Sequence, residues 1–231
     1  MEYLEENLKK VNEKIIESAV KSGRSPEDIR VVAVTKTVPP DVIQKAVDCG
    51  ITILGENRVQ EARSKVDLIK GDVEWHLIGH LQKNKVKTAV RLFSMVQSVD
   101  SLELAREIDR RAGEINKTID VLIQVNIGKE ATKFGIDYEE TEDFIKEVSQ
   151  LPWVKVRGLM AIAPFKENPE DTRPYFKKMH DLFISIKSLA IENVEMEYLS
   201  MGMTNDFTVA IEEGSNMVRI GTGIFGERKV K

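Results

Sequence analysis

The chain has 231 residues, of which 42% are hydrophobic and 31% charged, with a formal net charge of −4 and a pI of about 5.6. This composition is typical of soluble globular proteins and excludes disordered and fibrous classes. The acidic balance argues against nucleic acid as a partner, because phosphate binding needs a concentrated positive field. The single cysteine, Cys49, excludes an intramolecular disulfide and favours a reducing, cytoplasmic location. No signal peptide or membrane-spanning run is apparent, so no membrane partner is expected.

Hydrophobic periodicity predicts helices and strands that alternate along the chain. A leading amphipathic helix is expected over residues 4–19, where apolar residues recur every three or four positions. Apolar, β-branched runs predict strands over residues 31–36, 51–56, 75–80, 94–99, 120–127, 156–164, 198–202 and 217–223. Amphipathic runs between them predict helices over residues 39–50, 57–69, 81–93, 100–115, 137–151, 174–190 and 204–214.

The uninterrupted alternation, with no low-complexity linker, indicates one domain over residues 1–231. Eight such units most naturally close into a (β/α)8 TIM barrel of the α/β class, with the extra N-terminal helix compensating for a truncated final helix. An open doubly wound sheet is the alternative. It would usually carry a G-x-G-x-x-G turn after an early strand, and the segments after the first two strands lack this pattern.

The first expected strand is an apolar run, VVAVTK, that ends in Lys36. A strand buried on both faces is typical of a parallel sheet, and the carboxyl end of such a strand is where barrels place their sites. Closure of the barrel would bring the last strand beside the first, so Arg219 and the loop Gly221-Thr222-Gly223 would lie next to Lys36. This loop and residues 200–204 can supply the backbone N–H groups and hydroxyls that bind a phosphate.

Each of these features alone has a simpler interpretation. Gly-Thr-Gly is often only a tight turn, a strand-end lysine often only a solvent-facing charge, and Arg219 could be a structural arginine paired with Glu56. Together they favour a phosphorylated carbonyl ligand that forms a Schiff base, because a desolvated lysine beside another cation loses part of its preference for the protonated form. Pyridoxal 5′-phosphate (PLP) supplies both the aldehyde and the phosphate.

A set of longer motifs carries a family resemblance over nearly the whole chain: VAVTKTVPP, GENRVQEA, WHLIGHLQKNK, SVDS, VNIGKEATKFG, RGLMAI, LSMGMTNDF and VRIGTGIFGER. The sequence resembles the YggS/PROSC family of PLP-binding homeostasis proteins, whose fold is similar to the N-terminal domain of alanine racemase. The resemblance implies a PLP site made of Lys36, Asn57, Met160, Ser200, Gly202, Arg219, Gly221 and Thr222. Of these, Lys36 would carry PLP as a Schiff base, Arg219 would face the pyridine nitrogen and Met160 would border the ring. The glycines, Ser200 and Thr222 would hold the phosphate.

The same resemblance implies a carrier that takes part in intracellular vitamin B6 homeostasis, not a catalyst of metabolic turnover. An arginine at the pyridine nitrogen would leave the ring neutral and disfavour carbanion chemistry, and the racemases' second domain with its tyrosine is not expected after Lys231. PLP-requiring apoenzymes would be the partners, and a monomer or weak homodimer the oligomeric state.

Two enzymatic alternatives remain open. One is a small PLP-dependent racemase or transaminase-like enzyme with one of the four tyrosines, such as Tyr175 or Tyr198, or a lysine as second base. The other is a class I aldolase that forms its substrate Schiff base on Lys36. No metal site is expected, since His76 and His80 lie on one strand face at a spacing better suited to structural roles.

Overall fold

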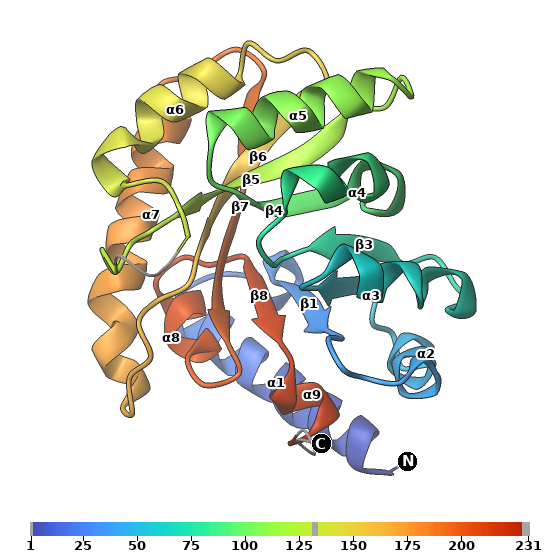
Figure 1. The fold of residues 1–231 in the computed structure, drawn as a ribbon. Coiled ribbons are helices and arrows are strands. Elements are labelled where there is room, and N and C mark those ends of the chain that lie inside the picture. The colour runs from blue at the N-terminus through green and yellow to red at the C-terminus, as the bar shows by residue number, and fades with distance from the viewer. Residues whose placement is uncertain (1, 131–133, 228–231) are drawn as a thin grey trace.

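The computed structural model describes residues 2–130 and 134–227. Its eight strands are all parallel and close into a barrel in sequence order, with β8 paired to β1. Figure 1 shows the strands in the centre with the helices around them. The strands are β1 (Arg30–Val34), β2 (Ile53–Glu56), β3 (Glu74–Leu77), β4 (Met95–Val99), β5 (Ile119–Val125), β6 (Val154–Ala161), β7 (Val194–Met203) and β8 (Met217–Ile220). The predicted (β/α)8 TIM barrel is therefore confirmed, and the open sheet is not what forms.

Helices connect the strands on the outside of the barrel. They are α2 (Pro40–Asp48), α3 (Val59–Arg63), α4 (Val86–Leu92), α5 (Leu102–Gly113), α6 (Thr141–Val148), α7 (Arg173–Ser188), α8 (Phe207–Glu212) and α9 (Thr222–Phe225). The leading helix α1 (Glu2–Lys21) packs against α8 and α9, and Asn7 Nδ2 donates to Ile224 O at 3.0 Å. The long first helix thus covers the side of the barrel that the four-residue α9 leaves open, as the sequence predicts.

The hydrophobic core has two layers, because strands in such a barrel are buried on both faces. The outer layer lies between strands and helices and contains most of the apolar side chains. The inner layer fills the barrel and consists of Val32, Ile53, Met95, Leu122, Met160, Tyr198 and Met217. Packing on both faces explains why the strand sequences read as continuous apolar runs instead of alternating.

Two elements differ from the prediction near the carboxyl end of the barrel. Strand β1 ends at Val34, so Lys36 lies in the turn that follows and not in the strand itself. The helix expected over residues 57–69 is interrupted: α3 ends at Arg63, and a separate 3-10 turn, η2, covers Val66–Leu68. Lys65 lies at this interruption, between the two helical segments, and its side chain is buried.

No helix among residues 2–130 and 134–227 combines the length and apolarity that a membrane crossing requires.

Candidate functional site

The residues proposed from the sequence come from one continuous arc of the barrel, β6-β7-β8-β1-β2. Lys36 and Asn57 follow β1 and β2, Met160 lies in β6, Ser200 and Gly202 in β7, Arg219 in β8, and Gly221 and Thr222 follow β8. Val32 of β1 pairs with Arg219 of β8. The loops that carry Lys36 and Gly221 therefore leave neighbouring strands, and closure of the barrel is what makes them neighbours.

Arg219 is the buried cation of this arc, with only 3% of its surface exposed. Its Nη1 donates to Ser200 Oγ at 2.6 Å and its Nη2 donates to Ala161 O at 2.9 Å. Burial lowers the pKa of Arg219 to about 10, with the charge of Asp206 acting in the opposite direction, so the guanidinium remains positive at neutral pH. Arg219 therefore has partners other than Glu56, the structural partner that the sequence allows.

A row of hydrogen-bonded side chains, which we call the interior row, runs from Arg219 along the inside of the barrel. Ser200 Oγ donates to Gln97 Oε1 at 2.7 Å, Gln97 Nε2 lies 2.9 Å from His76 Nδ1, and His76 Nε2 lies 3.3 Å from Glu74 Oε2. Ser200, Gln97 and His76 are fully buried, whereas Glu74 lies at the start of β3 and is exposed. The Ser200 hydroxyl proton is already donated within this row, so it is not directed at a phosphate here. The phosphate contact expected for Ser200 stays a prediction.

Lys36 is half-buried and follows a residue that contacts a buried acid. The preceding residue, Thr35, is fully buried, and its Oγ1 donates to Glu56 Oε1 at 2.7 Å. Burial raises the pKa of Glu56, while hydrogen bonds from Lys65 and Thr35 offset part of that effect. The turn of Lys36 is therefore anchored to a carboxyl group at the end of the neighbouring strand.

Asn57 is held against the loop that follows β3. A Cβ atom placed on Gly79 would lie 2.4 Å from Asn57 O and 2.8 Å from Asn57 Cα, so only glycine allows this approach of two backbones. Ser98 Oγ, at the end of β4, donates to Gly79 O at 2.7 Å. The backbone of Asn57, just beyond the end of β2, thereby has a fixed place against the loop that follows β3.

The loops after β7 and β8 are joined to each other. Gly202 has a φ of +93°, and the chain then turns so that Met203 N donates to Asp206 Oδ1 at 2.7 Å. Gly223 N, in the first turn of α9, donates to Thr204 Oγ1 at 3.2 Å. Contacts from Gly221 and Thr222 to a phosphate remain predictions, but the loop that contains them is braced by its neighbour.

The two tyrosines considered as second bases do not belong to this arrangement. Tyr198 lies in the inner core near the strand starts, with the guanidinium carbons of Arg30 and Arg157 at 5.0 and 5.6 Å from its ring centroid. Tyr175 belongs to the outer helix α7 and packs against the outer core. Neither position favours the racemase alternative.

The histidines have structural partners. His76 belongs to the interior row, and His80 Nδ1 lies 3.2 Å from Asp100 Oδ2 while its ring stacks on Phe134 at 3.9 Å. His80 thus connects the loops after β3, β4 and β5. Among the described residues, no group of three or more His, Cys, Asp or Glu side chains is arranged to hold a metal ion.

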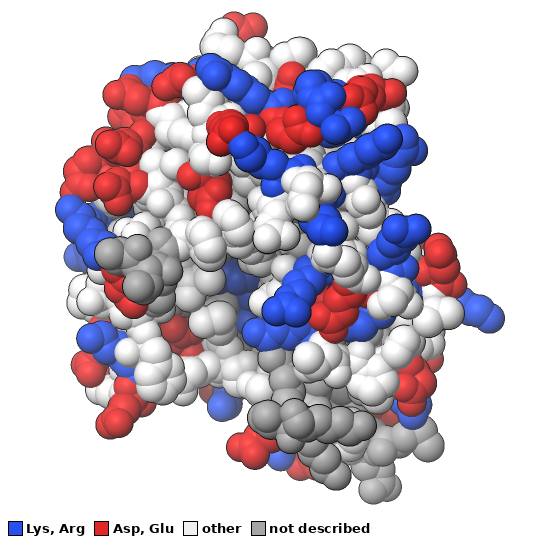
Figure 2. Space-filling model, in the orientation of Figure 1, with Lys and Arg blue, Asp and Glu red and all other residues white. Residues whose placement is uncertain are grey.

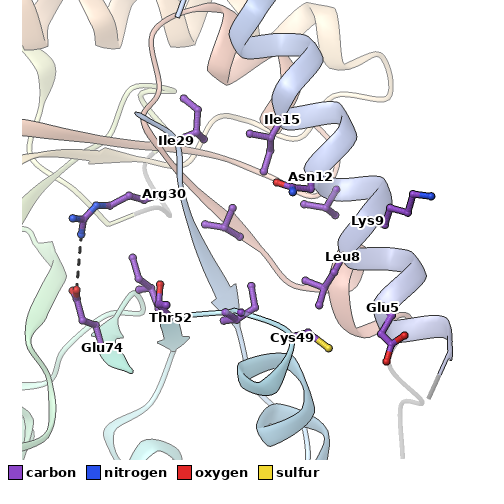
Figure 3. Close-up of a pocket in the computed structure, with 15 residues that line it drawn as sticks. Glu5, Leu8, Lys9, Asn12, Ile15, Ile29, Arg30, Cys49, Thr52 and Glu74 are labelled. Atoms are coloured by element: carbon purple, nitrogen blue, oxygen red, sulfur yellow. Dashed lines mark ion pairs between the residues drawn. The ribbon is translucent and has the colours of Figure 1, made fainter. Parts of the chain in front are cut away.

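Two hollows lie at different places on the molecule. Figure 2 shows Lys and Arg side chains at a hollow near the centre of the face in view, with Asp and Glu side chains also close to it. A separate cavity of about 750 Å³ lies between α1, the end of α2 and the starts of the strands, where Arg30 and Glu74 approach to 3.9 Å (Figure 3). Because Lys36 follows the opposite end of β1, this cavity does not form part of the candidate site.

Two residues that organise the site were not identified from the sequence. The sequence pattern places Gln97 in a buried strand and Lys65 in an amphipathic helix, and it gives neither residue a role at the site. A buried amide inside a barrel strand is a detectable signal for Gln97, since such a group needs hydrogen-bond partners. Nothing comparable marks Lys65, because Glu61 and Lys65 have the spacing of an ordinary surface ion pair on a helix.

Comparisons with known proteins agree with this geometry. The family model for the alanine racemase N-terminal domain matches residues 4–229. The pyridoxal phosphate homeostasis protein of Aquifex aeolicus is 46% identical over 225 residues, which cover 97% of this chain and 98% of that protein. The protein of that name from Escherichia coli K12 is 38% identical over 234 residues, covering 99% and 98% of the two chains.

A solved structure extends the comparison to three dimensions. PipY of Synechococcus elongatus PCC7942, with PLP bound, superimposes with a TM-score of 0.79 at 35% identity, covering 92% of this chain and 100% of PipY. By sequence and by fold, the chain belongs to the family of pyridoxal phosphate homeostasis proteins, within the alanine racemase N-terminal domain family.

Proposed function

We propose that this protein binds PLP as a Schiff base on Lys36 and takes part in vitamin B6 homeostasis without metabolic turnover. The observation that supports this most directly is the convergence, at the ends of adjoining strands β8 and β1, of a buried guanidinium, a glycine loop and a half-buried lysine. The relatives named for PLP homeostasis and the PLP bound to PipY support the same ligand. When bound, PLP supplies an aldehyde that reacts with amines and a ring that withdraws electrons from neighbouring carbon.

The donor set of the arc fits this ligand. The Lys36 amine would engage the aldehyde, and the fully buried Met160 would offer an apolar contact for the ring. The backbone at Gly221 and the exposed Thr222 would hold the phosphate at the start of α9, where the short helix presents N–H groups. Gly202, which has no side chain, would allow the end of β7 to approach the phosphate.

Arg219 supports a holding role over a catalytic one. Its pKa of about 10 leaves it protonated at neutral pH, and a guanidinium only donates hydrogen bonds. PLP enzymes that need a strong electron sink keep the pyridine nitrogen protonated, which a carboxylate achieves and a second cation opposes. A ring that faces Arg219 would therefore be a weak electron sink. PLP-requiring apoenzymes are the partners we propose, with the carrier as a monomer or weak homodimer.

The test is whether PLP attaches to Lys36. Wild-type protein, Lys36→Met and the matched control Lys87→Met, which removes an exposed lysine of α4, are mixed with PLP, reduced with borohydride and mapped by peptide analysis. We expect a visible absorption band and a reduced adduct on Lys36 in wild type and in the control, and neither in Lys36→Met. Normal attachment in Lys36→Met would overturn the site. Sustained product formation from a panel of L-amino acids would overturn the non-catalytic role, and a colourless protein with no reducible PLP would revive the aldolase alternative.

A further inference from the structure

The environment of Lys65 points to a function that neither the sequence nor the relatives' names assign. This lysine follows α3, and its side chain is 7% exposed. Its Nζ donates to Thr35 O at 2.8 Å, to Glu56 Oε1 at 2.7 Å and to Glu61 Oε1 at 2.7 Å. An ammonium has three N–H donors, so these contacts use all of them. All three donors of the Lys65 ammonium are therefore engaged within the protein.

Two of these contacts control the backbone on both sides of Lys36. Thr35 O belongs to the peptide group that precedes Lys36, and it accepts directly from Lys65. The N–H of Thr37 belongs to the peptide group that follows Lys36, and it donates to Glu61 Oε1, the same oxygen that accepts from Lys65. One ammonium thus fixes both peptide groups that flank Lys36, one directly and the other through Glu61.

The turn that is held in this way adopts an unfavourable conformation. Thr37 has a φ of +62°, a left-handed conformation that β-branched residues rarely adopt. Strained residues of this kind persist only where surrounding contacts determine their conformation, and they concentrate at functional sites. The direction of the Lys36 side chain depends on this turn, so a contact that maintains the turn also aims the amine.

The charges of the cluster fit the same role. Burial pushes the pKa of Glu61 upward, but hydrogen bonds from Lys65 and the Thr37 amide outweigh it and lower that pKa overall. Glu56 is fully buried, and within the described part of the chain its second oxygen, Oε2, has no hydrogen-bond partner. Without Lys65, both carboxyl groups would lose its positive charge, and the turn would lose the ammonium contact at Thr35 O.

We propose that Lys65 is a positioning residue for Lys36: together with Glu61, Glu56, Thr35 and Thr37 it forms a clasp that holds the turn after β1. This role rests on the proposed function, because it concerns the rate at which the Lys36 amine meets an aldehyde. None of the clasp residues is among those proposed to contact the phosphate or the ring. Loss of the clasp should therefore slow formation of the covalent bond and leave binding of the ring and phosphate nearly unchanged.

The experiment compares two ligands on Lys65→Met. PLP reports formation of the covalent bond, and 4′-deoxypyridoxine 5′-phosphate, which keeps the ring and phosphate but lacks the aldehyde, reports binding alone. We expect the rate of adduct formation with PLP to fall about tenfold to a hundredfold, the effect of a misdirected reacting group, while the affinity for the analogue changes less than about threefold. The matched control is Lys117→Met, which removes a half-buried lysine that donates to Val90 O and Phe93 O. It should leave both readouts at wild-type values.

The outcomes separate the possible failures. An unchanged adduct rate in Lys65→Met, or an equal loss of PLP and analogue binding, would overturn the positioning role. If Lys65→Met does not fold, Glu61→Ala and Glu61→Gln replace it in the test. Glutamine keeps an acceptor for the Thr37 amide, so Glu61→Gln should form the PLP adduct faster than Glu61→Ala. Equal rates of adduct formation in the two variants would overturn the proposal. A wild-type protein that binds the analogue but forms no adduct on Lys36 would overturn the proposed function itself, and the role of Lys65 with it.

Discussion

Substitution of Gly202 by alanine is expected to destabilise the fold by two separable effects. The φ of +93° is unfavourable for any residue with a side chain, which costs about 1–3 kcal/mol. The new Cβ would also lie 2.6 Å from Ala210 Cβ and 2.9 Å from Phe207 Cα, and a backbone atom cannot turn away as a flexible side chain would. Forced contacts of this kind cost about 1–3 kcal/mol, so Gly202→Ala should lose about 2–6 kcal/mol in total.

Gly50→Ala isolates the first effect. Gly50 has a φ of +99°, but no atom lies within 4 Å of the position that its Cβ would take. It should therefore lose only about 1–3 kcal/mol, the cost of the backbone conformation. Urea unfolding of the two variants measures the difference, and with a slope of about 1–3 kcal/mol per M the midpoints should be clearly separate.

The same pair tests whether the end of β7 matters for the ligand. Relief of the contact with Phe207 requires the start of α8 to move, and the loop that binds Gly223 through Thr204 would move with it. Affinity for PLP should fall in Gly202→Ala and stay at the wild-type value in Gly50→Ala. Equal unfolding free energies for the two variants would refute the reasoning, because they would show that the loop relaxes without cost.

Three further changes have defined outcomes. In Glu61→Gln, the free energy of unfolding should fall less steeply as the pH is lowered. Folding lowers the pKa of Glu61, so the contribution of this group to stability is complete above its ordinary pKa of 4.5 and disappears as the pH falls through the folded pKa. Denaturation curves at several pH values measure this dependence. Gln97→Leu removes the acceptor of the Ser200 hydroxyl proton and the partner of His76 Nδ1, at about 1–3 kcal/mol for each buried group, and an unchanged urea midpoint would mean that the interior row is not formed in solution. Arg219→Met should weaken PLP binding about tenfold to a hundredfold through loss of a charged hydrogen bond, and an unchanged dissociation constant in a titration would exclude Arg219 from the ligand contacts.

The general architecture was predictable because its signals are local. Each buried parallel strand reads as an apolar run, and Pro40 and Gly50 mark the ends of α2 in the usual way. The neighbourhood of Lys36 and Arg219 followed from closure of the barrel, which the number and order of the units indicate. These parts of the prediction required no knowledge of individual side-chain contacts.

The clasp and the interior row were not predictable in the same way. The break between α3 and η2 that buries Lys65 has no proline or glycine to announce it, and a Glu-Lys pair four residues apart is usually exposed to solvent. The row depends on side chains from four strands whose register only the folded barrel defines. In both cases the information resides in contacts between segments that are distant in sequence.

The interior row also has a direction. Arg219 has no acceptor, so the Ser200 oxygen must receive from it and pass its own proton toward Gln97 Oε1. The Gln97 amide then presents its NH2 to His76 Nδ1, which leaves the proton of a neutral imidazole on Nε2, pointing at Glu74. The hydrogen bonds that start at a permanent cation near the carboxyl end of the barrel therefore favour one tautomer of a histidine near its amino end. A proton on His76 Nδ1 would require the Gln97 amide to flip, so that Ser200 Oγ would accept from both Gln97 and Arg219 and its own proton would lose its acceptor.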